Sequence, residues 1–181
     1  VEAFTIDSIK MVLIHLPDKV ILYNETAAET FGLESAFSVI KSDVLGNNPF
    51  RAKSFVNDLD LGKWVGGDKI DSTIGFLDES KATHYDDIAE WELYTPILPL
   101  EGASVSQLEI NTITGFSPDN DATVGMSITR DGLFYPQEYF QLYTTNLDYK
   151  QRFIMRRLGY VRDSIGFKFR GASRSRMNFS Y

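Results

Sequence analysis

Apolar and polar residues alternate without a break in the stretch Thr123-Val124-Gly125-Met126-Ser127-Ile128-Thr129. The three apolar residues of this stretch fall on one side of an extended chain, because successive side chains of a β-strand point to opposite faces. The same alternation returns in Leu108-Glu109-Ile110-Asn111 and in Ile165-Gly166-Phe167-Lys168-Phe169-Arg170. This pattern is typical of antiparallel sheets that have one buried face and one hydrated face.

Turn signals lie between the apolar runs. Pro17-Asp18-Lys19 predicts a β-hairpin, because proline presets the φ angle of a turn and aspartate bonds the backbone that follows it. Gly66-Gly67-Asp68-Lys69 predicts a second hairpin turn, between Trp64-Val65 and residues 73–77. Asp131-Gly132 predicts a tight turn after the alternating stretch.

Strands are expected about every 8 to 12 residues, which is the spacing of sandwiches, barrels and propeller blades. Residues 36–40 and 52–56 are expected to form strands on either side of the breakers at 46–49. Residues 24–33 lack breakers before Gly32 and could form one helical turn, but we expect a loop there. The sequence therefore predicts an all-β fold.

The length of 181 residues allows two small domains. Pro96 and Pro99 stiffen the segment 95–102, which is the candidate crossover between them. We expect a first β domain at residues 1–94 and a second at residues 95–181. The chain begins at Val1 rather than at Met, so we expect it to be part of a longer protein.

Charge is distributed unevenly along the chain. Residues 1–149 contain 9 Lys and Arg against 24 Asp and Glu, whereas residues 150–181 contain 9 against Asp163 alone. Such opposite fields favour association with other copies of the chain or with an anionic partner. The chain contains no cysteine, which excludes disulfides and thiolate chemistry, and no apolar run is long enough to cross a bilayer.

Catalytic signals are weak. His15 lies in an apolar strand and His84 in an acidic loop, so both are expected to be structural, and no nucleophile elbow or zinc-binding helix occurs. Asp58-Leu59-Asp60-Leu61-Gly62 and Asp119-Asn120-Asp121 resemble calcium loops, but turns capped by aspartate explain them better. We expect no cofactor and no enzymatic activity, although paired carboxylates that cleave glycans cannot be recognised from spacing.

Basic residues gather near the end of the chain and are the candidate interface residues. They are Arg152, Arg156, Arg157, Arg162, Lys168, Arg170, Arg174 and Arg176. One interpretation is a hydrated strand face with ion pairs inside the chain. The other is a docking or channel-lining surface, on which guanidinium groups meet carboxylates of a neighbour or DNA phosphates.

Three groups of residues resemble a known family. They are residues 156–162 with 165–170, the preceding residues 129–135, and the opening 13–17 and 20–23 followed by Gly67-Asp68-Lys69. Together they resemble the C-terminal portion of the packaged-DNA stabilisation proteins, or tail hub proteins, of short-tailed bacteriophages. The resemblance implies an incomplete propeller-like β region followed by a β-sandwich.

The resemblance also implies a mechanical role in the virion tail. Such proteins form a homohexameric ring that plugs the portal channel, stabilises packaged DNA and joins the portal adaptor to the tail needle and tailspikes. They assemble in the host cytoplasm, act without a cofactor, and involve no membrane.

Two rival functions remain open at this point. One is a carbohydrate-binding or glycan-cleaving β module, in which Trp64 or Trp91 would stack on a sugar, although a packed core tryptophan is the simpler interpretation. The other is nucleic-acid binding by the basic segment.

Overall fold

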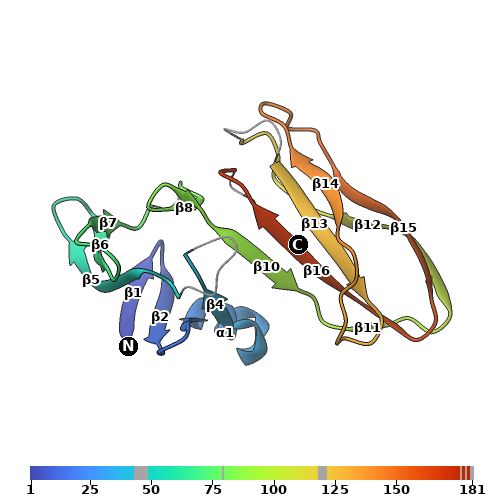
Figure 1. The fold of residues 1–181 in the computed structure, drawn as a ribbon, viewed down its shortest axis with the longest axis horizontal. Coiled ribbons are helices and arrows are strands. Elements are labelled where there is room, and N and C mark those ends of the chain that lie inside the picture. The colour runs from blue at the N-terminus through green and yellow to red at the C-terminus, as the bar shows by residue number, and fades with distance from the viewer. Residues whose placement is uncertain (43–48, 79, 118–121, 176, 178, 180–181) are drawn as a thin grey trace. The chain divides into compact units, whose positions relative to one another are not determined.

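The computed structural model describes residues 1–42, 49–78, 80–117, 122–175, 177 and 179. The chain forms two units, Val1–Ala89 and Glu90–Tyr181 (Figure 1). The division falls after Ala89 rather than after Tyr94, because β10 (Glu90–Tyr94) pairs along its whole length with β16 (Ser164–Ala172) in the second unit.

The first unit contains a four-stranded antiparallel sheet and a three-stranded one. The first sheet has the order β1 (Glu2–Ile6), β2 (Ile9–His15), β3 (Val20–Asn24) and β4 (Phe37–Ile40). The second has the order β5 (Ala52–Asp58), β6 (Lys63–Asp68) and β7 (Ile74–Phe76), and β8 (Thr83–His84) pairs with β9 (Asp87–Ile88). A small core gathers Phe4, Leu13, Val20, Phe50 and Ala52.

One of the two predicted hairpin turns in this unit is confirmed and the other is misplaced. β2 and β3 pair across Pro17-Asp18-Lys19, where the Leu16 N–H donates to the Lys19 carbonyl at 2.9 Å. Gly66, Gly67 and Asp68 instead lie within β6, and the chain reverses further on, where the Asp68 N–H donates to the Thr73 carbonyl at 3.0 Å. The glycines serve packing here, since the ring of Phe55 covers Gly66 and a Cβ there would lie 2.7 Å from it.

The expectation of a loop at residues 24–33 is wrong, because α1 (Glu25–Phe31) forms there. The side chain of Asn24 caps this helix by accepting the Ala27 N–H at 3.0 Å. Thr26 ties it to β2, since its Oγ1 accepts the Lys10 N–H at 3.3 Å. Gly32 ends the helix with a φ of 95°, as expected.

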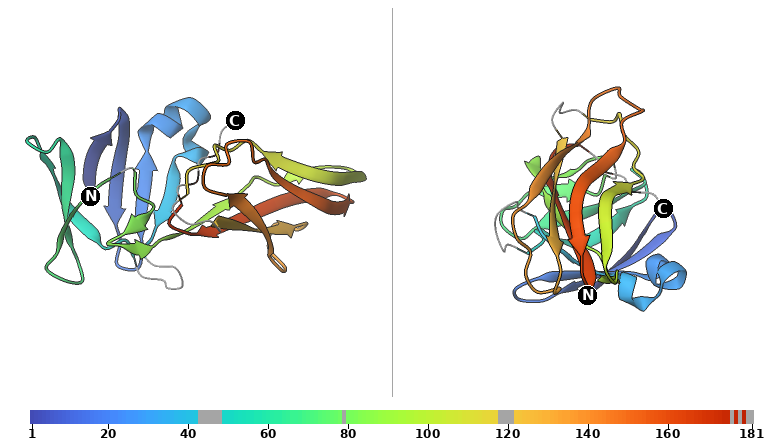
Figure 2. Two further views of the ribbon diagram at one scale, coloured as in Figure 1. Left: turned by 90° about the horizontal axis from the view of Figure 1, so that it is seen from above. Right: turned by 90° about the vertical axis from the view of Figure 1, so that its right-hand side faces the viewer.

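The second unit is a β-sandwich whose two sheets face each other (Figure 2). One sheet has the order β10, β16, β13 (Ala122–Thr129) and β14 (Tyr139–Thr144), with β11 (Leu98–Pro99) also paired to β16. The other contains β12 (Ala103–Ile110) and β15 (Phe153–Val161). The three alternating stretches of the sequence lie in β12, β13 and β16, so the predicted strands are confirmed. The predicted hydrated face is wrong for β13, where Ser127 and Thr129 are buried.

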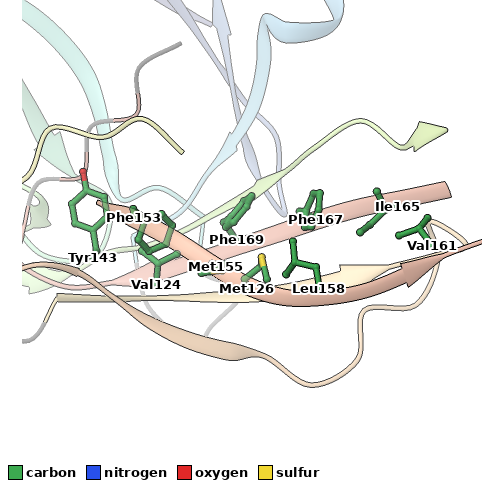
Figure 3. Packing of buried hydrophobic residues seen from close by; sticks show 10 residues of the cluster. All are labelled: Val124, Met126, Tyr143, Phe153, Met155, Leu158, Val161, Ile165, Phe167 and Phe169. Carbon is green, nitrogen blue, oxygen red and sulfur yellow. The ribbon is translucent and has the colours of Figure 1, made fainter. Parts of the chain in front are cut away.

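The core of the sandwich fills the space between these sheets. Figure 3 shows its side chains in one row, with contributions from both layers: Val124, Met126, Tyr143, Phe153, Met155, Leu158, Val161, Ile165, Phe167 and Phe169. Asp131 forms the turn predicted after β13, where its Oδ1 accepts the N–H groups of Leu133 at 2.9 Å and Phe134 at 3.0 Å.

Candidate interaction surface

Four of the basic candidate residues lie on two strands in opposite sheets of the sandwich. β15 carries Arg156 and Arg157 in the two-stranded sheet, and β16 carries Lys168 and Arg170 in the other. The basic segment therefore does not form one continuous face, and each group has surroundings of its own.

Lys168 and Arg170 form ion pairs within the chain. They alternate with the buried Phe167 and Phe169 and so lie on the outer face of the sheet. Lys168 Nζ lies 2.8 Å from Oε1 of Glu92 on β10. For these two residues the structure agrees with the first interpretation of the basic segment, which is a strand face with ion pairs inside the chain.

Arg170 joins two carboxylates from different parts of the fold. Its Nε donates to Glu138 Oε1 at 2.9 Å and its Nη2 to Glu138 Oε2 at 2.6 Å, while Nη1 donates to Glu90 Oε1 at 2.8 Å. The guanidinium lowers the pKa of Glu138 although partial burial opposes this, and the hydrogen bonds that Arg170 donates to Glu138 and Glu90 raise the pKa of Arg170. This network ties the segment before β14 to β16 and β10.

Arg152 also has a partner within the chain. Its Nε donates to Oε1 of Glu109 at 2.6 Å, and its Nη2 pairs with Oε2 of the same carboxylate. The Arg152 side chain is 65% exposed, so this pair contributes little to stability.

Arg156 and Arg157 lie at a β-bulge in β15. Val105 pairs with Gly159 and Gln107 pairs with Arg156, so one residue of β12 faces two residues of β15. Arg157 has a φ of 63°, in the left-handed region that side chains other than glycine rarely adopt. Both arginines are exposed, and within the described ranges no acidic side chain forms an ion pair with either of them.

The two arginines border a groove of about 520 Å³ at the edge of the sandwich, between β14 and β15. Met126, Ile128, Met155 and Leu158 supply its aliphatic lining, and the first, third and fourth of these lie close together in Figure 3. The remaining lining residues are Arg130, Pro136, Tyr139, Phe140, Gln141, Arg156 and Arg157. Among the residues that the structure describes, three arginines and no carboxylate line this groove.

Sequence reasoning missed Arg130, Tyr139 and Phe140 as parts of this surface. Arg130 directly follows the alternating stretch, at the end of β13. Tyr139 and Phe140 are consecutive in β14. Two neighbours in one strand point to opposite faces, so at least one of them had to lie outside the core, and both are exposed. Adjacent aromatic residues in a predicted strand were the signal that could have pointed here.

The remaining basic candidates lie away from these pairs. Arg162 is 87% exposed and its Nε lies 4.0 Å from the carboxylate of Asp163. Arg174 is exposed and interacts within the chain, and Arg176 lies outside the described residues.

The two histidines lie in packed surroundings. His15 Nδ1 lies 2.9 Å from Lys69 Nζ, and its Nε2 lies 3.2 Å from Glu2 Oε1. Burial and the Lys69 ammonium lower the pKa of His15, and burial lowers the pKa of His84, whose ring packs edge-on against Phe50.

The acidic turns match their predicted role where the structure describes them. Asp58 Oδ1 accepts the N–H groups of Asp60 at 2.9 Å and Leu61 at 3.1 Å, which is a turn capped by aspartate. Asp119-Asn120-Asp121 lies outside the described residues. Within the described ranges, no group of three His, Asp or Glu could hold a metal ion. No helix in the same ranges is long and apolar enough to span a membrane.

Both tryptophans are used in packing. Trp64 packs in the core of the first unit, where its Nε1 donates to the Thr5 carbonyl at 2.8 Å. Trp91 packs against the sandwich core and meets the ring of Phe179 edge-on, with centroids 5.4 Å apart. Neither geometry favours sugar stacking.

Comparison with known proteins adds a consistent finding for each unit. A family model described as the β-sandwich of bacteriophage P22 Gp10 matches residues 90–181, and one described as the β-propeller of the same protein matches residues 1–82. The tail hub protein gp10 of Salmonella phage P22 is 28% identical over 180 residues, which cover 99% of this chain and 36% of that protein. The chain thus spans just over a third of the curated relative that it matches, and the expected order of a propeller-like region before a sandwich is confirmed.

Proposed function

The chain belongs to the bacteriophage P22 Gp10 family, and from this membership we propose that it forms part of a structural tail hub in a phage virion. The observation that carries the proposal is the match of both units, in the same order, to the two domains of one tail protein. The packing of the sandwich supports it, because a continuous core makes a rigid body on which interfaces can be built.

In finer detail, the full-length protein forms a homohexameric ring that plugs the portal channel and stabilises the packaged DNA. The ring joins the portal adaptor to the tail needle and tailspikes, after assembly in the host cytoplasm. Two features of this chain support a role in joining proteins. Arginines without an ion pair in the described part of the chain border the groove, and exposed aromatic side chains lie beside them. Arginine and aromatic residues are enriched in protein interfaces.

The role is mechanical rather than enzymatic. Two of the carboxylates with a lowered pKa, Asp68 and Glu138, are bound to arginines of the chain itself. Both tryptophans are engaged in packing, which disfavours the sugar stacking that the alternative of a carbohydrate-binding or glycan-cleaving module assigned to them.

The proposal is tested in phage that carry a nonsense codon in the gene of the full-length protein. Particles without the protein should package DNA, release it, and lack needle and tailspikes by electron microscopy. Supplying the full-length protein from a plasmid should restore filled particles. Filled, fully tailed particles in the absence of the protein would refute the tail hub role.

A further inference from the structure

The groove between β14 and β15 combines an aliphatic lining with a border of three guanidinium groups. Met126, Ile128, Met155 and Leu158 form the aliphatic part, while Arg130, Arg156 and Arg157 supply the charge. Within the described ranges no ion pair neutralises these three arginines, in contrast to Arg152 and Arg170 in the same unit. The groove therefore presents an unmatched positive charge next to an apolar surface.

The backbone around the groove is also open to pairing. β14 is the last strand of its sheet, and β15 pairs only with β12 in the described part of the sandwich. In the described part of the sandwich each strand therefore has one edge without a neighbouring strand, and such an edge can template an added strand. The bulge at Arg156 and Arg157 disrupts regular pairing along β15, so the edge of β14 is the better template.

We propose that this groove binds an extended, acidic segment of another tail protein, which places aliphatic side chains against the lining and carboxylates on the three arginines. The inference rests on the proposed function, because it requires neighbours in the assembled tail. Guanidinium groups bind carboxylates in a forked geometry, and aliphatic anchors beside such pairs exclude water from them.

The aliphatic lining distinguishes this partner from nucleic acid. A phosphate backbone would meet the arginines but would leave the apolar side of the groove uncovered, to which the partly exposed Ile128 contributes. Tyr139 and Phe140 could stack on unpaired bases, and the experiment therefore includes DNA as an outcome.

Photo-crosslinking in assembled virions tests the inference. The photoreactive residue p-benzoylphenylalanine replaces Tyr139 in the full-length protein, and the crosslinked peptide is sequenced by mass spectrometry. We expect a peptide from a different tail protein that contains at least two carboxylates and an aliphatic residue. The matched control places the same residue at Tyr160, which lies on β15 but does not line the groove, and should not capture that peptide.

A second pair of variants tests the charges. The double substitution Arg156→Glu and Arg157→Glu should reduce the crosslink from position 139 at least tenfold, whereas Arg152→Glu, outside the groove, should leave it unchanged. A crosslink to DNA, to this same protein or to a segment without carboxylates would overturn the inference, as would no crosslink at all. If the virions contain the protein and retain their DNA in those cases, the tail hub role stands and only the groove's partner is wrong.

Discussion

Individual residues in the sandwich are constrained by what lies directly over them. Gly171 on β16 faces Trp91 on β10, and a Cβ at this position would lie 2.6 Å from three atoms of the indole ring. Arg170, its neighbour, is held on the opposite face by Glu90 and Glu138. The residue type at position 171 is therefore limited by the space under Trp91, and the one at position 170 by its two carboxylate partners.

The substitution Gly171→Ala should lower the free energy of unfolding by roughly 1–3 kcal/mol, because the added methyl group must displace the Trp91 ring. Urea unfolding of the chain measures this loss. In a Trp91→Leu background the same substitution should cost much less, since the obstructing ring is gone. Equal losses in both backgrounds would show that the ring is not the obstacle.

Arg170→Met should remove the part of the loss of folding stability in acid that is due to Glu138. Arg170 lowers the pKa of Glu138 below the ordinary value of 4.5, so the folded chain binds fewer protons than the unfolded chain in acid. This contribution to stability is present above pH 4.5 and is lost as the pH falls through the folded-state pKa. The measurement is the urea midpoint as a function of pH. It should fall below pH 4.5 more steeply for the natural chain than for the variant, and parallel curves would contradict the prediction.

At the scale of whole elements, the β-bulge in β15 turns two arginine side chains toward the groove that we propose for binding. The bulge in β15 inserts one extra residue, so the strand returns Leu158 to the core after two exposed arginines. The predicted alternation of a regular strand would have placed Arg157 on the core side, because it lies two residues after the buried Met155. The bulge thus keeps both Arg156 and Arg157 exposed while Met155 and Leu158 stay in the core.

Arg157→Gly and Arg157→Val should differ clearly in stability. Glycine adopts the φ of 63° without a steric penalty, so its free energy of unfolding should stay within about 1 kcal/mol of the natural chain. Valine is branched at Cβ and should lower stability by more than about 1 kcal/mol. Thermal unfolding of both variants measures this, and similar losses for the two would argue against a left-handed residue at the bulge.

The whole chain consists of two units that differ in the size of their buried core, which among the described residues contains ten residues in the second unit and five in the first. The sandwich encloses a continuous core from both sheets. In the first unit, Phe37 and Val39 on β4 and Ile74 and Phe76 on β7 stay exposed. Blades of a propeller pack against neighbouring blades, and residues 1–82 match a propeller, so these surfaces fit contacts to further blades.

Residues 90–181 alone should fold, and residues 1–89 alone should not. The sandwich fragment should unfold cooperatively in urea, because its core is formed entirely by its own residues. The fragment 1–89 should bind a hydrophobic dye and aggregate, since its exposed apolar strands lack partners. Circular dichroism and light scattering distinguish these results, and a monomeric, cooperatively folded fragment 1–89 would contradict the second expectation.

Local patterns were sufficient for several features of this protein. Alternation at Val124, Met126 and Ile128 identified a strand, and Pro17-Asp18 identified a hairpin, because strands and turns depend on residues close in sequence. The helix after Asn24 was missed because a seven-residue helix is weak by itself and forms here with a cap and a tie to β2.

The sequence by itself determined the all-β class, the hairpins with proline and aspartate turns, and the basic segment from which the interface candidates come. Only the tertiary structure decided which of these cations are already paired. Glu90, Glu109 and Glu138 lie between 32 and 80 residues from their arginine partners, and no spacing rule connects them. The groove likewise joins β13, β14 and β15, because side chains distant in the chain become neighbours only when two sheets pack together.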